Sequence, residues 1–430
     1  MSRHLQGAAI VALLAAGAPG GAQPASDAAL RARVERVLRS TPLVDGHNDL
    51  PWAIRESEIA PRDIERYDLR KTTTGQTDFK RIKAGLLGGQ FWSVYIPGEM
   101  RDSGYARVQL EQIDIARRVF AKYPDVFQPS NSAADVRRAF ANRKIGSLLG
   151  MEGGHAIENS LGALRAFYAL GVRYMTLTHN VTLDWADAAN DKAVHGGLTP
   201  FGKEVVREMN RLGMLVDLSH VSPAVMSDAL NTTAAPVIFS HSSARALTDV
   251  PRNVPDSILR RLPANGGVVM VTFVPGFTNQ TVANHEAAMN RLRDSLTKAF
   301  PSDPDARFKG LAAWTQAHPA PRSTVGDVAD HIEHIRKTAS INNVGIGGDF
   351  DGITAVPIGL EDVSKYPTLF VELARRGWSD ADLRKLAGEN VLRVLTQAEQ
   401  VAARVQRERP ASTATIEQLD GKRPAGRATP

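Results

Sequence analysis

Eight short apolar segments, separated by helical and polar stretches, constrain the fold of this 430-residue chain more than any other feature. They lie at about residues 43–48, 91–96, 145–151, 174–179, 215–219, 236–240, 267–273 and 343–348. Segments between them, such as 105–123 and 202–212, repeat apolar residues three or four positions apart, which is typical of amphipathic helices. Strands that alternate with helices in this way pair in parallel through right-handed crossovers. We therefore expect an α/β fold.

Polar residues at the ends of these strands distinguish two α/β architectures. Histidines and acids end six of the eight candidates: His47, Asp49, Glu152, His179, His220, His241 and Asp349. An open, doubly wound sheet arises from the same alternation, but only a closed ring brings the ends of the first and eighth strands together. The pattern therefore favours a (β/α)8 TIM barrel with insertions and a metal site at the C-terminal ends of its strands.

Chain length suits one such barrel, which takes about 250 residues before insertions, although two domains would also fit. We expect a single catalytic barrel over residues 27–405. The segment 275–324 is too long for a bare connection, and we expect an insertion there with an amphipathic helix near 285–300. Residues 409–430 are rich in Pro, Ala, Thr and charge, which predicts a disordered tail.

The first 22 residues have the features of a secretory signal peptide. A positively charged start precedes an apolar stretch at residues 7–18, and small residues follow, with a predicted cut near Ala22. The apolar stretch is too short to span a bilayer, so stable membrane insertion is not expected. The chain has no cysteine, so disulfides are excluded and any metal must be held by nitrogen and oxygen. Export to a bacterial periplasm fits these features.

A formal net charge of +6 raises the question of nucleic-acid binding. The basic residues are scattered along the chain, and no platform of aromatic and basic residues accompanies them. A generally basic surface explains the charge, and no nucleic-acid partner is expected.

The strand-end residues have the chemistry of a two-metal site. His47 and Asp49 are two residues apart and therefore point to the same side of a strand. A carboxylate such as Glu152 has two oxygens and can bridge two cations, which a neutral imidazole cannot do. His220 and His241 would hold the second ion. Each alone could be an ordinary hydrogen-bonded residue, but together they predict incomplete coordination that water would fill, as in a catalytic site.

Long motifs of this chain, in the same order, resemble those of the membrane (renal) dipeptidase family. They are DGHNDLPW at 45–52, GGQFWSVY at 88–95, EGGH at 152–155, LTHN at 177–180, DLSH at 217–220, SHSS at 240–243, RNVP at 252–255, GGDFDG at 347–352 and GENVL at 388–392. The resemblance runs from about residue 42 to Leu395. It implies a dipeptidase with two zinc ions on an amidohydrolase-like barrel, and a homodimer is compatible with it.

Site roles follow from the resemblance by motif. The family's pattern assigns His47 and Asp49 to one zinc, His220 and His241 to the other, and Glu152 to both. His179 is similar to the family's histidine near the scissile carbonyl, and Arg252 to the residue that binds the dipeptide carboxylate. Asp349 is similar to the acid that transfers protons and meets the free amine.

The resemblance therefore makes Asp349, His179 and Glu152 the expected catalytic residues. A D-residue at the C-terminal position of the dipeptide is compatible with it, and other divalent ions could replace zinc. Animal members carry cysteines and an apolar, lipid-anchoring tail signal, which this chain lacks, so membrane attachment and a disulfide-linked dimer do not transfer.

Two other functions fit parts of the pattern. A lactonase, phosphotriesterase, deaminase or other amide hydrolase would share the barrel and the metals. Those enzymes commonly carry a His-x-His pair on the first strand and often a modified lysine, whereas this chain has His47 and Asp49. An exported metal-binding or solute-binding protein without turnover is the other alternative. A protein of that kind has no need for a proton-transferring acid such as Asp349.

Overall fold

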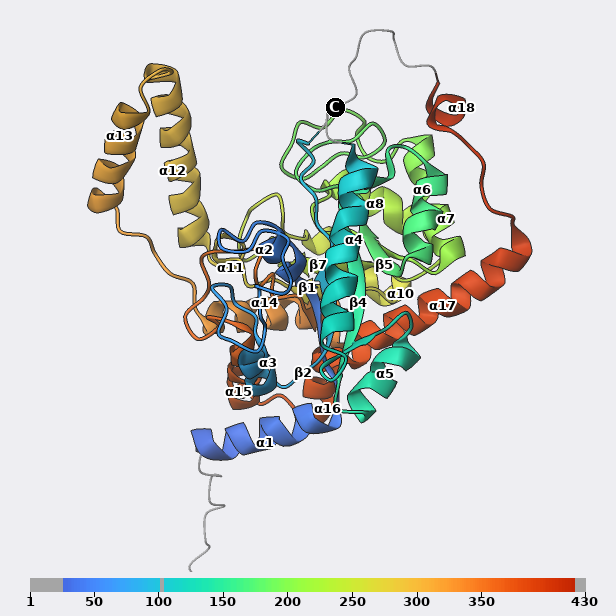
Figure 1. The fold of residues 1–430 in the computed structure, drawn as a ribbon, viewed down its shortest axis with the longest axis horizontal. Coiled ribbons are helices and arrows are strands. Elements are labelled where there is room, and N and C mark those ends of the chain that lie inside the picture. Colours follow the sequence, from blue (N-terminus) through green and yellow to red (C-terminus); the bar gives the residue numbers. More distant parts are fainter. Residues whose placement is uncertain (1–25, 101–103, 422–430) are drawn as a thin grey trace, which may run out of the picture.

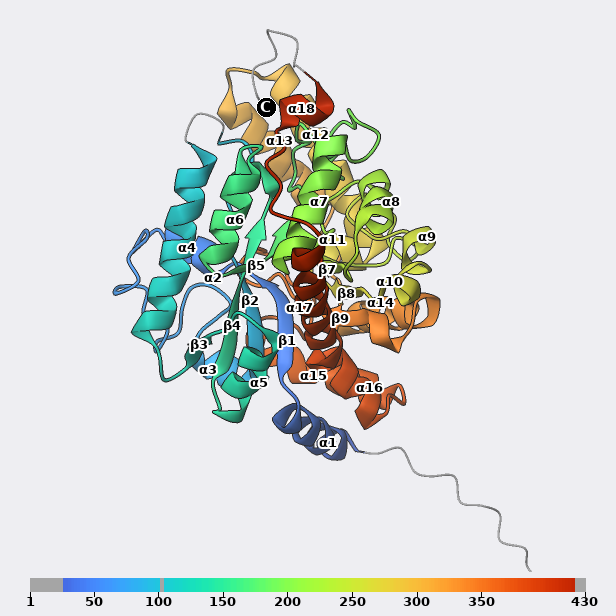
Figure 2. The same cartoon turned by 90° about the vertical axis from the view of Figure 1, so that its right-hand side faces the viewer.

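The computed structural model describes residues 26–100 and 104–421, and its strands form a closed parallel barrel (Figures 1 and 2). The barrel strands are β1 (Leu43–Asn48), β2 (Leu87–Ser93), β4 (Ile145–Glu152), β5 (Val172–Thr176), β6 (Leu215–Asp217), β7 (Ile238–Ser242), β8 (Val268–Val271) and β9 (Val344–Ile346). Each pairs with its neighbours in this order, β9 returns to β1, and β2 pairs directly with β4. The predicted (β/α)8 barrel is confirmed.

One short strand, β3 (Phe127–Pro129), lies outside this ring. It pairs with the first residues of β4, Ile145 to Ser147, whereas β5 pairs with the last ones, Leu149 to Glu152. The end of β4 therefore remains inside the ring, and Glu152 lies at the carboxyl edge of the barrel.

β2 begins several residues before the predicted segment 91–96. Its first residues include Gly88 and Gly89, and glycine is disfavoured inside strands. The structure shows why glycine is needed there: a Cβ at Gly88 would lie 2.8 Å from Cα of Pro42. Close packing between neighbouring segments thus overrides the local preference.

Helices surround the barrel, and most of them cover its outside (Figure 1). They are α1 (Asp27–Ser40), α2 (Leu50–Arg55), α3 (Phe79–Gly85), α4 (Tyr105–Lys122), α5 (Ala133–Ala141), α6 (Leu161–Ala169), α7 (Pro200–Leu212), α8 (Pro223–Thr232), α9 (Asp256–Leu259), α10 (Leu262–Asn265), α11 (Pro275–Thr278), α12 (Gln280–Ala299), α13 (Pro304–Ala317), α14 (Val325–Thr338), α15 (Tyr366–Arg375), α16 (Asp380–Arg384), α17 (Asn390–Glu408) and α18 (Ile416–Asp420). α7 shows how sequence sets these bounds: Thr199 caps its first turn, Pro200 occupies the first helical position, and Gly213 ends it in a left-handed conformation.

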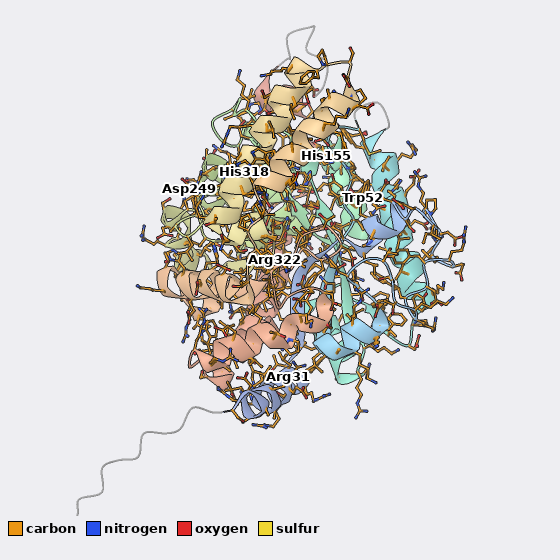
Figure 3. The ribbon with its side chains drawn as sticks, turned by 90° about the vertical axis from the view of Figure 1, so that its left-hand side faces the viewer. Arg31, Trp52, His155, Asp249, His318 and Arg322 are labelled. Carbon is orange, nitrogen blue, oxygen red and sulfur yellow. The ribbon has the colours of Figure 1, made fainter. Side chains whose placement is uncertain are left out.

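Residues 275–324, where the sequence predicts an insertion, form α11, α12 and α13. The last two pair as a helical hairpin that extends away from the barrel (Figure 1). Figure 3 shows the hairpin from its outer side, with His318 labelled just beyond the end of α13. In the described chain, α13 buries none of its residues, so the hairpin adds little to the barrel core.

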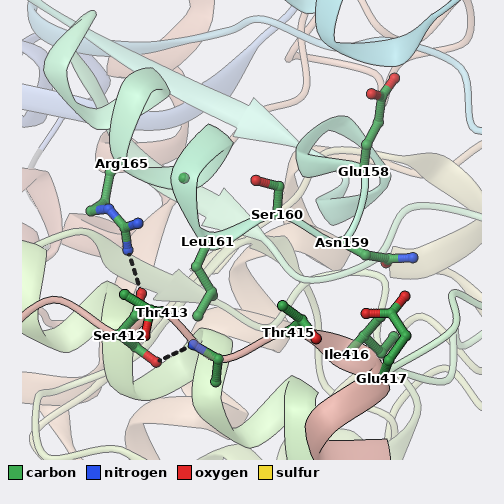
Figure 4. Close-up of a pocket in the computed structure, with 12 residues that line it drawn as sticks. Glu158, Asn159, Ser160, Leu161, Arg165, Ser412, Thr413, Thr415, Ile416 and Glu417 are labelled. Atoms are coloured by element: carbon green, nitrogen blue, oxygen red, sulfur yellow. Dashed lines mark hydrogen bonds between the residues drawn. The ribbon is translucent and has the colours of Figure 1, made fainter. Parts of the chain in front are cut away.

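The segment 409–421 differs from the predicted disorder. It follows a defined path along α7 and ends in the short helix α18, where Ile416 is buried. Arg409 pairs with Glu204, and Arg165 donates to the carbonyl of Ser412 over 2.9 Å (Figure 4). Asp420 accepts hydrogen bonds from the Phe201 amide and the Thr199 hydroxyl. The tail charges Arg409 and Asp420, which suggest disorder in isolation, have partners on α7 and its N-cap residue, and α6 binds the tail backbone through Arg165.

The predicted signal peptide and residues 422–430 lie outside the described residues. Across the ranges 26–100 and 104–421, none of the helices has the length and apolar character needed to cross a membrane.

Close packing inside the barrel generates a stability prediction at Gly347. A Cβ there would lie 1.8 Å from the carbonyl oxygen of Ser240, a backbone atom that cannot rotate away. We expect Gly347→Ala to destabilise the protein by about 3 kcal/mol, the upper range for overpacking. Thermal unfolding followed by circular dichroism measures the effect.

Gly162→Ala is the matched control. Gly162 lies in α6, and its Cβ would meet only ordinary contacts, the nearest being Oγ of Ser160 at 3.4 Å. Alanine is the better helix former, so this variant should be no less stable than the parent. Equal destabilisation by the two substitutions would contradict the packing argument.

Candidate metal centre

The Glu152 carboxylate is the centre of a buried cluster at the carboxyl edge of the barrel. Its Oε1 lies 3.0 Å from Nε2 of His220 and 3.3 Å from Nε2 of His241. Its Oε2 lies 3.3 Å from Nε2 of His47 and within 3.4 Å of the Ser93 hydroxyl. One oxygen of the carboxylate therefore faces a pair of imidazoles, and the other faces a third imidazole, that of His47.

On the Oε2 side, the end of β1 supplies two adjacent ligand candidates. Nε2 of His47 lies 3.2 Å from Oδ2 of Asp49 and 4.0 Å from Oδ1 of Asp349. Backbone hydrogen bonds continue past the ends of β1 and β9 here. The Asp49 amide donates to the Phe350 carbonyl, and the Asp349 amide donates to the His47 carbonyl. Closure of the barrel between β1 and β9 thus brings together residues 300 positions apart in sequence.

On the Oε1 side, His220 follows β6, and His241 lies near the end of the neighbouring strand β7. Their Nε2 atoms are 2.9 Å apart, and the His179 ring packs on His220 with centroids 4.4 Å apart. Nε2 of His179 is 3.9 Å from Oε1 of Glu152. The structure therefore brings all seven strand-end residues named by the sequence into one site.

Two of these residues have backbone conformations that side chains other than glycine rarely adopt. His220 has a φ of 67° and Asp349 a φ of 64°. Such conformations cost of order 1–3 kcal/mol and persist where the surroundings enforce them, commonly at functional sites. Here they aim an imidazole and a carboxyl at the same centre.

Two buried acids brace the backbone beneath the site. Asp45 accepts hydrogen bonds from the amides of His47 and Gly348 and from the Tyr366 hydroxyl. Asp217 accepts from the amides of Ser219 and Ser240. Each acid therefore joins two strand ends that carry site residues.

Burial and neighbouring side chains set the ionisation of the cluster. Burial would raise the pKa of Glu152, but His47, His220 and His241 hold it well below its usual value. Burial lowers the pKa of His220 and His241 well below normal, with Arg252 adding to the effect. These two imidazoles are therefore neutral at neutral pH, the form that binds a cation.

The pKa values of His47 and Asp349 are raised instead. Burial would lower the pKa of His47, but Tyr174, Glu152 and Asp49 raise it well above normal. Burial raises the pKa of Asp349 well above normal, and the nearby carboxylates of Asp49 and Glu152 add to this, against His47 and Arg252. Asp349 is thus a carboxyl group able to hold a proton.

The donor set fits divalent cations. Three overlapping groups have ligand atoms within 4.8 Å of one another: His47, Glu152 and His241; Glu152, His179 and His220; and His47, Asp49 and Asp349. Within the described residues, Nε2 of His47 and Oδ1 of Asp49 are buried and make no hydrogen bond. Buried nitrogen and oxygen atoms that converge without partners are suited to a metal ion.

Arg252 borders the cluster from the loop after β7. Its side chain is buried, its Nη2 donates to the His241 carbonyl over 3.4 Å, and its guanidinium lies 5.2 Å from the Phe277 ring. Burial lowers its pKa to about 10, so it stays charged at neutral pH, and its attraction to Asp349 opposes that shift. The Nη1 atom has no hydrogen-bond partner in the described chain, which leaves a donor for an anionic group.

His179 lies at the edge of the cluster rather than at its centre. Its ring packs against Tyr95 with centroids 4.8 Å apart, and Tyr95 in turn contacts Trp52. Burial lowers the pKa of His179, with Arg252 adding to the effect, so its imidazole is neutral and carries one N–H donor.

The sequence does not reveal the two hydroxyl groups that contact the Nδ1 atoms of His47 and His241. Tyr174 contacts Nδ1 of His47, and Ser240 contacts Nδ1 of His241, each over 2.8 Å. Tyr174 follows the alternation of β5 as an ordinary apolar residue would, and serines are common near strand ends. The one available signal was the position of Ser240 immediately before a candidate ligand.

The family model for membrane dipeptidases (peptidase family M19) matches residues 31–409. The chain belongs to this family. It is therefore a metallopeptidase that acts on dipeptides, and the predicted family and enzyme class are confirmed.

Solved structures of family members share the fold of this dipeptidase. The probable dipeptidase PvdM from Pseudomonas aeruginosa is 26% identical, with a TM-score of 0.75 over 87% of this chain and 99% of that one. Dipeptidase AC, a metallopeptidase of family M19, is 25% identical, with a TM-score of 0.68 over 83% and 98% of the two chains. A metallopeptidase from Rhodobacter sphaeroides, bound to a phosphinate mimic of L-Ala-D-Ala, is 24% identical, with a TM-score of 0.68 over 83% and 99%.

Metal removal tests the cluster directly. Without cations, three carboxyl groups share one buried site, and each ion present at 100 times its Kd would add about 2.7 kcal/mol to the free energy of unfolding. We expect dialysis against a chelator to lower Tm and zinc to restore it. Differential scanning calorimetry measures both steps.

Glu152→Gln should lose the response to zinc, because a neutral amide cannot balance the charge of a bound cation as a carboxylate does. Glu65→Gln, at a carboxylate whose side chain is 74% exposed, should keep it. A Tm that is insensitive to chelator and zinc in the parent protein would contradict the metal assignment.

Proposed function

We propose that this dipeptidase hydrolyses the peptide bond of dipeptides at a centre of two zinc ions. His47 and Asp49 would hold one ion, His220 and His241 the other, and Glu152 would contact both. The observation that supports this assignment is the division of Glu152, whose Oε1 faces His220 and His241 while its Oε2 faces His47. When bound, two divalent cations lower the pKa of a water molecule to near neutrality and so supply a hydroxide nucleophile.

Arg252 would select dipeptides by binding their terminal carboxylate. In a dipeptide this carboxylate lies one residue beyond the scissile bond, and a guanidinium can bind it through two parallel hydrogen bonds. The buried Nη1 of Arg252, without a partner in the described chain, supports this role. A longer peptide would place an uncharged amide at the same position and leave the buried cation unpaired, which is unfavourable.

Asp349 and His179 would act on the reacting bond. The raised pKa of Asp349 suits a carboxyl group that accepts a proton from the attacking water and delivers it to the leaving nitrogen. In its ionised form the same group would pair with the free amine of the substrate. The neutral His179 would donate its N–H to the developing oxyanion, an interaction typically worth about 10²- to 10³-fold in rate.

The proposal includes dipeptides with a D-residue at the C-terminal position. A guanidinium that holds the carboxylate contacts a group common to both configurations, so Arg252 does not itself discriminate between them. Discrimination would come from the pocket wall, including the loop 180–199, whose Ala189 amide donates to the His220 carbonyl over 2.7 Å.

We also propose that the protein is exported to the periplasm. The charged start and apolar stretch of residues 1–22 support export, and the absence of cysteine is compatible with an oxidising compartment. Cell fractionation with an antibody against the chain tests this directly.

Hydrolysis assays test the proposed activity. We expect the zinc-loaded protein to cleave L-Ala-L-Ala and L-Ala-D-Ala, to cleave tripeptides poorly, and to lose activity on chelation. Liquid chromatography of the released amino acids measures all three. A purified protein that neither binds metal nor cleaves dipeptides after zinc addition would contradict the proposal.

The role of Arg252 gives a separate prediction. Arg252→Ala should raise KM for dipeptides on the order of 10²-fold, because a buried charge pair with the substrate is lost, worth at least about 2 kcal/mol. Steady-state kinetics should show a smaller change in kcat. A dipeptide with an amidated C-terminus should be a poor substrate for the parent protein and should not be further impaired in the variant.

Arg245→Ala is the control for the same loop, because among the described residues the ion-pair partner of Arg245 is Asp249, at the surface. Its KM should match that of the parent. An unchanged KM in Arg252→Ala would remove Arg252 from the substrate site.

A further inference from the structure

Two of the four clustered histidines have a hydroxyl group behind the ring. Nδ1 of His47 lies 2.8 Å from the Tyr174 hydroxyl, and Nδ1 of His241 lies 2.8 Å from the Ser240 hydroxyl. All four side chains are buried. A neutral imidazole carries its proton on one nitrogen only, so the partner of Nδ1 decides whether Nε2 presents a lone pair.

The Tyr174 hydroxyl has one hydrogen and two neighbours. It donates to the Gly46 carbonyl over 3.2 Å, and a carbonyl oxygen can only accept. With that hydrogen used, the Tyr174 oxygen must accept from Nδ1–H of His47. When the His47 ring is neutral, Nε2 then carries the lone pair, and it is this atom that faces Asp49 and Glu152.

The Ser240 hydroxyl is fixed in the same way by an acid. It lies 2.6 Å from Oδ2 of Asp217, which also accepts from the Thr176 hydroxyl. Oδ1 of Asp217 accepts from two backbone amides. An ionised carboxylate can only accept, so the Ser240 hydrogen goes to Asp217 and the Ser240 oxygen accepts from Nδ1–H of His241. Nε2 of His241 therefore presents its lone pair to the cluster.

The barrel interior is shaped to hold Tyr174 in this position. Tyr174 belongs to β5, yet its hydroxyl reaches the end of β1 through the interior. A Cβ at Gly150 of β4 would lie 2.0 Å from Cζ of Tyr174, so this path requires a glycine there. Phe91 packs on the ring from β2, with centroids 5.2 Å apart.

We propose that Tyr174, and Ser240 together with Asp217, are positioning residues that set the tautomers of His47 and His241. Each hydroxyl serves one of the two metal positions, so each controls the affinity of one ion. This inference rests on the proposed two-ion site. Outer partners of metal-binding histidines typically change metal affinity by about 10- to 100-fold when removed.

Metal affinities of single variants test the inference. We expect Tyr174→Phe and Ser240→Ala each to weaken one zinc equivalent by about 10- to 100-fold and to leave the other within a few-fold of the parent. Competition with a chromogenic chelator, using metal-free protein and zinc alone, measures both affinities. Tyr123→Phe and Ser147→Ala are the matched controls, since these buried hydroxyls bond elsewhere, to Asp68 and to the Ile145 carbonyl.

Asp217→Asn reverses the hydrogen bonds to the Thr176 and Ser240 hydroxyls without changing the size of the side chain. The amide oxygen must stay opposite the backbone amides of Ser219 and Ser240, so the NH₂ group faces the Ser240 hydroxyl as a donor. The Ser240 hydrogen is then directed to Nδ1 of His241, and the ring proton moves to Nε2. This variant should weaken the same zinc equivalent as Ser240→Ala.

Imidazole ¹⁵N chemical shifts provide a readout independent of activity, and their measurement in the parent protein does not depend on the folding of any variant. In the metal-free parent protein, at a pH where the rings are neutral, we expect His47 and His241 as Nδ1–H tautomers, and His241 as the Nε2–H tautomer in Asp217→Asn. An Nε2–H tautomer in the parent, or two unchanged zinc affinities in the Tyr174 and Ser240 variants, would overturn the inference while the proposed function stands. A parent protein that takes up no zinc would overturn the proposed function and the inference together.

Discussion

The buried carboxylate of Glu152 is the charge around which the rest of the site is arranged. A carboxylate removed from water is stable only when opposite charge and hydrogen bonds compensate it. Here His47, His220 and His241 surround its two oxygens, and the cations that they would hold supply the opposite charge. Because these histidines lie on three other segments of the chain, the compensation exists only in the closed barrel. Fold and site therefore depend on the same closure.

Rigid backbone at the strand ends keeps this arrangement in place. Asp45 links the end of β1 to the residues after β9, and Asp217 links β6 to β7. His220 and Asp349, whose conformations are left-handed, directly follow residues that these bonds hold, Ser219 and Gly348. Such a preorganised site pays the free energy of gathering like charges during folding rather than during each catalytic cycle.

Much of this arrangement could be predicted from sequence, because it depends on periodicity. Alternation of apolar strands and helices indicates the barrel, and candidate ligand residues such as His47 and Glu152 mark strand ends without any knowledge of packing. Features that depend on distant partners could not be predicted. β2 starts early because Gly88 must pack against Pro42, and the tail at 409–421 is ordered because Asp420 caps α7. Tyr174 and Ser240 resemble ordinary strand residues until the ring beside each is known.

Zinc-edge anomalous diffraction from crystals of the zinc-loaded protein tests the central claim most directly. The account predicts two anomalous peaks per chain, one between His47 and Asp49 and one between His220 and His241, each within coordination distance of one oxygen of Glu152. A single peak, or peaks that do not contact Glu152, would contradict it.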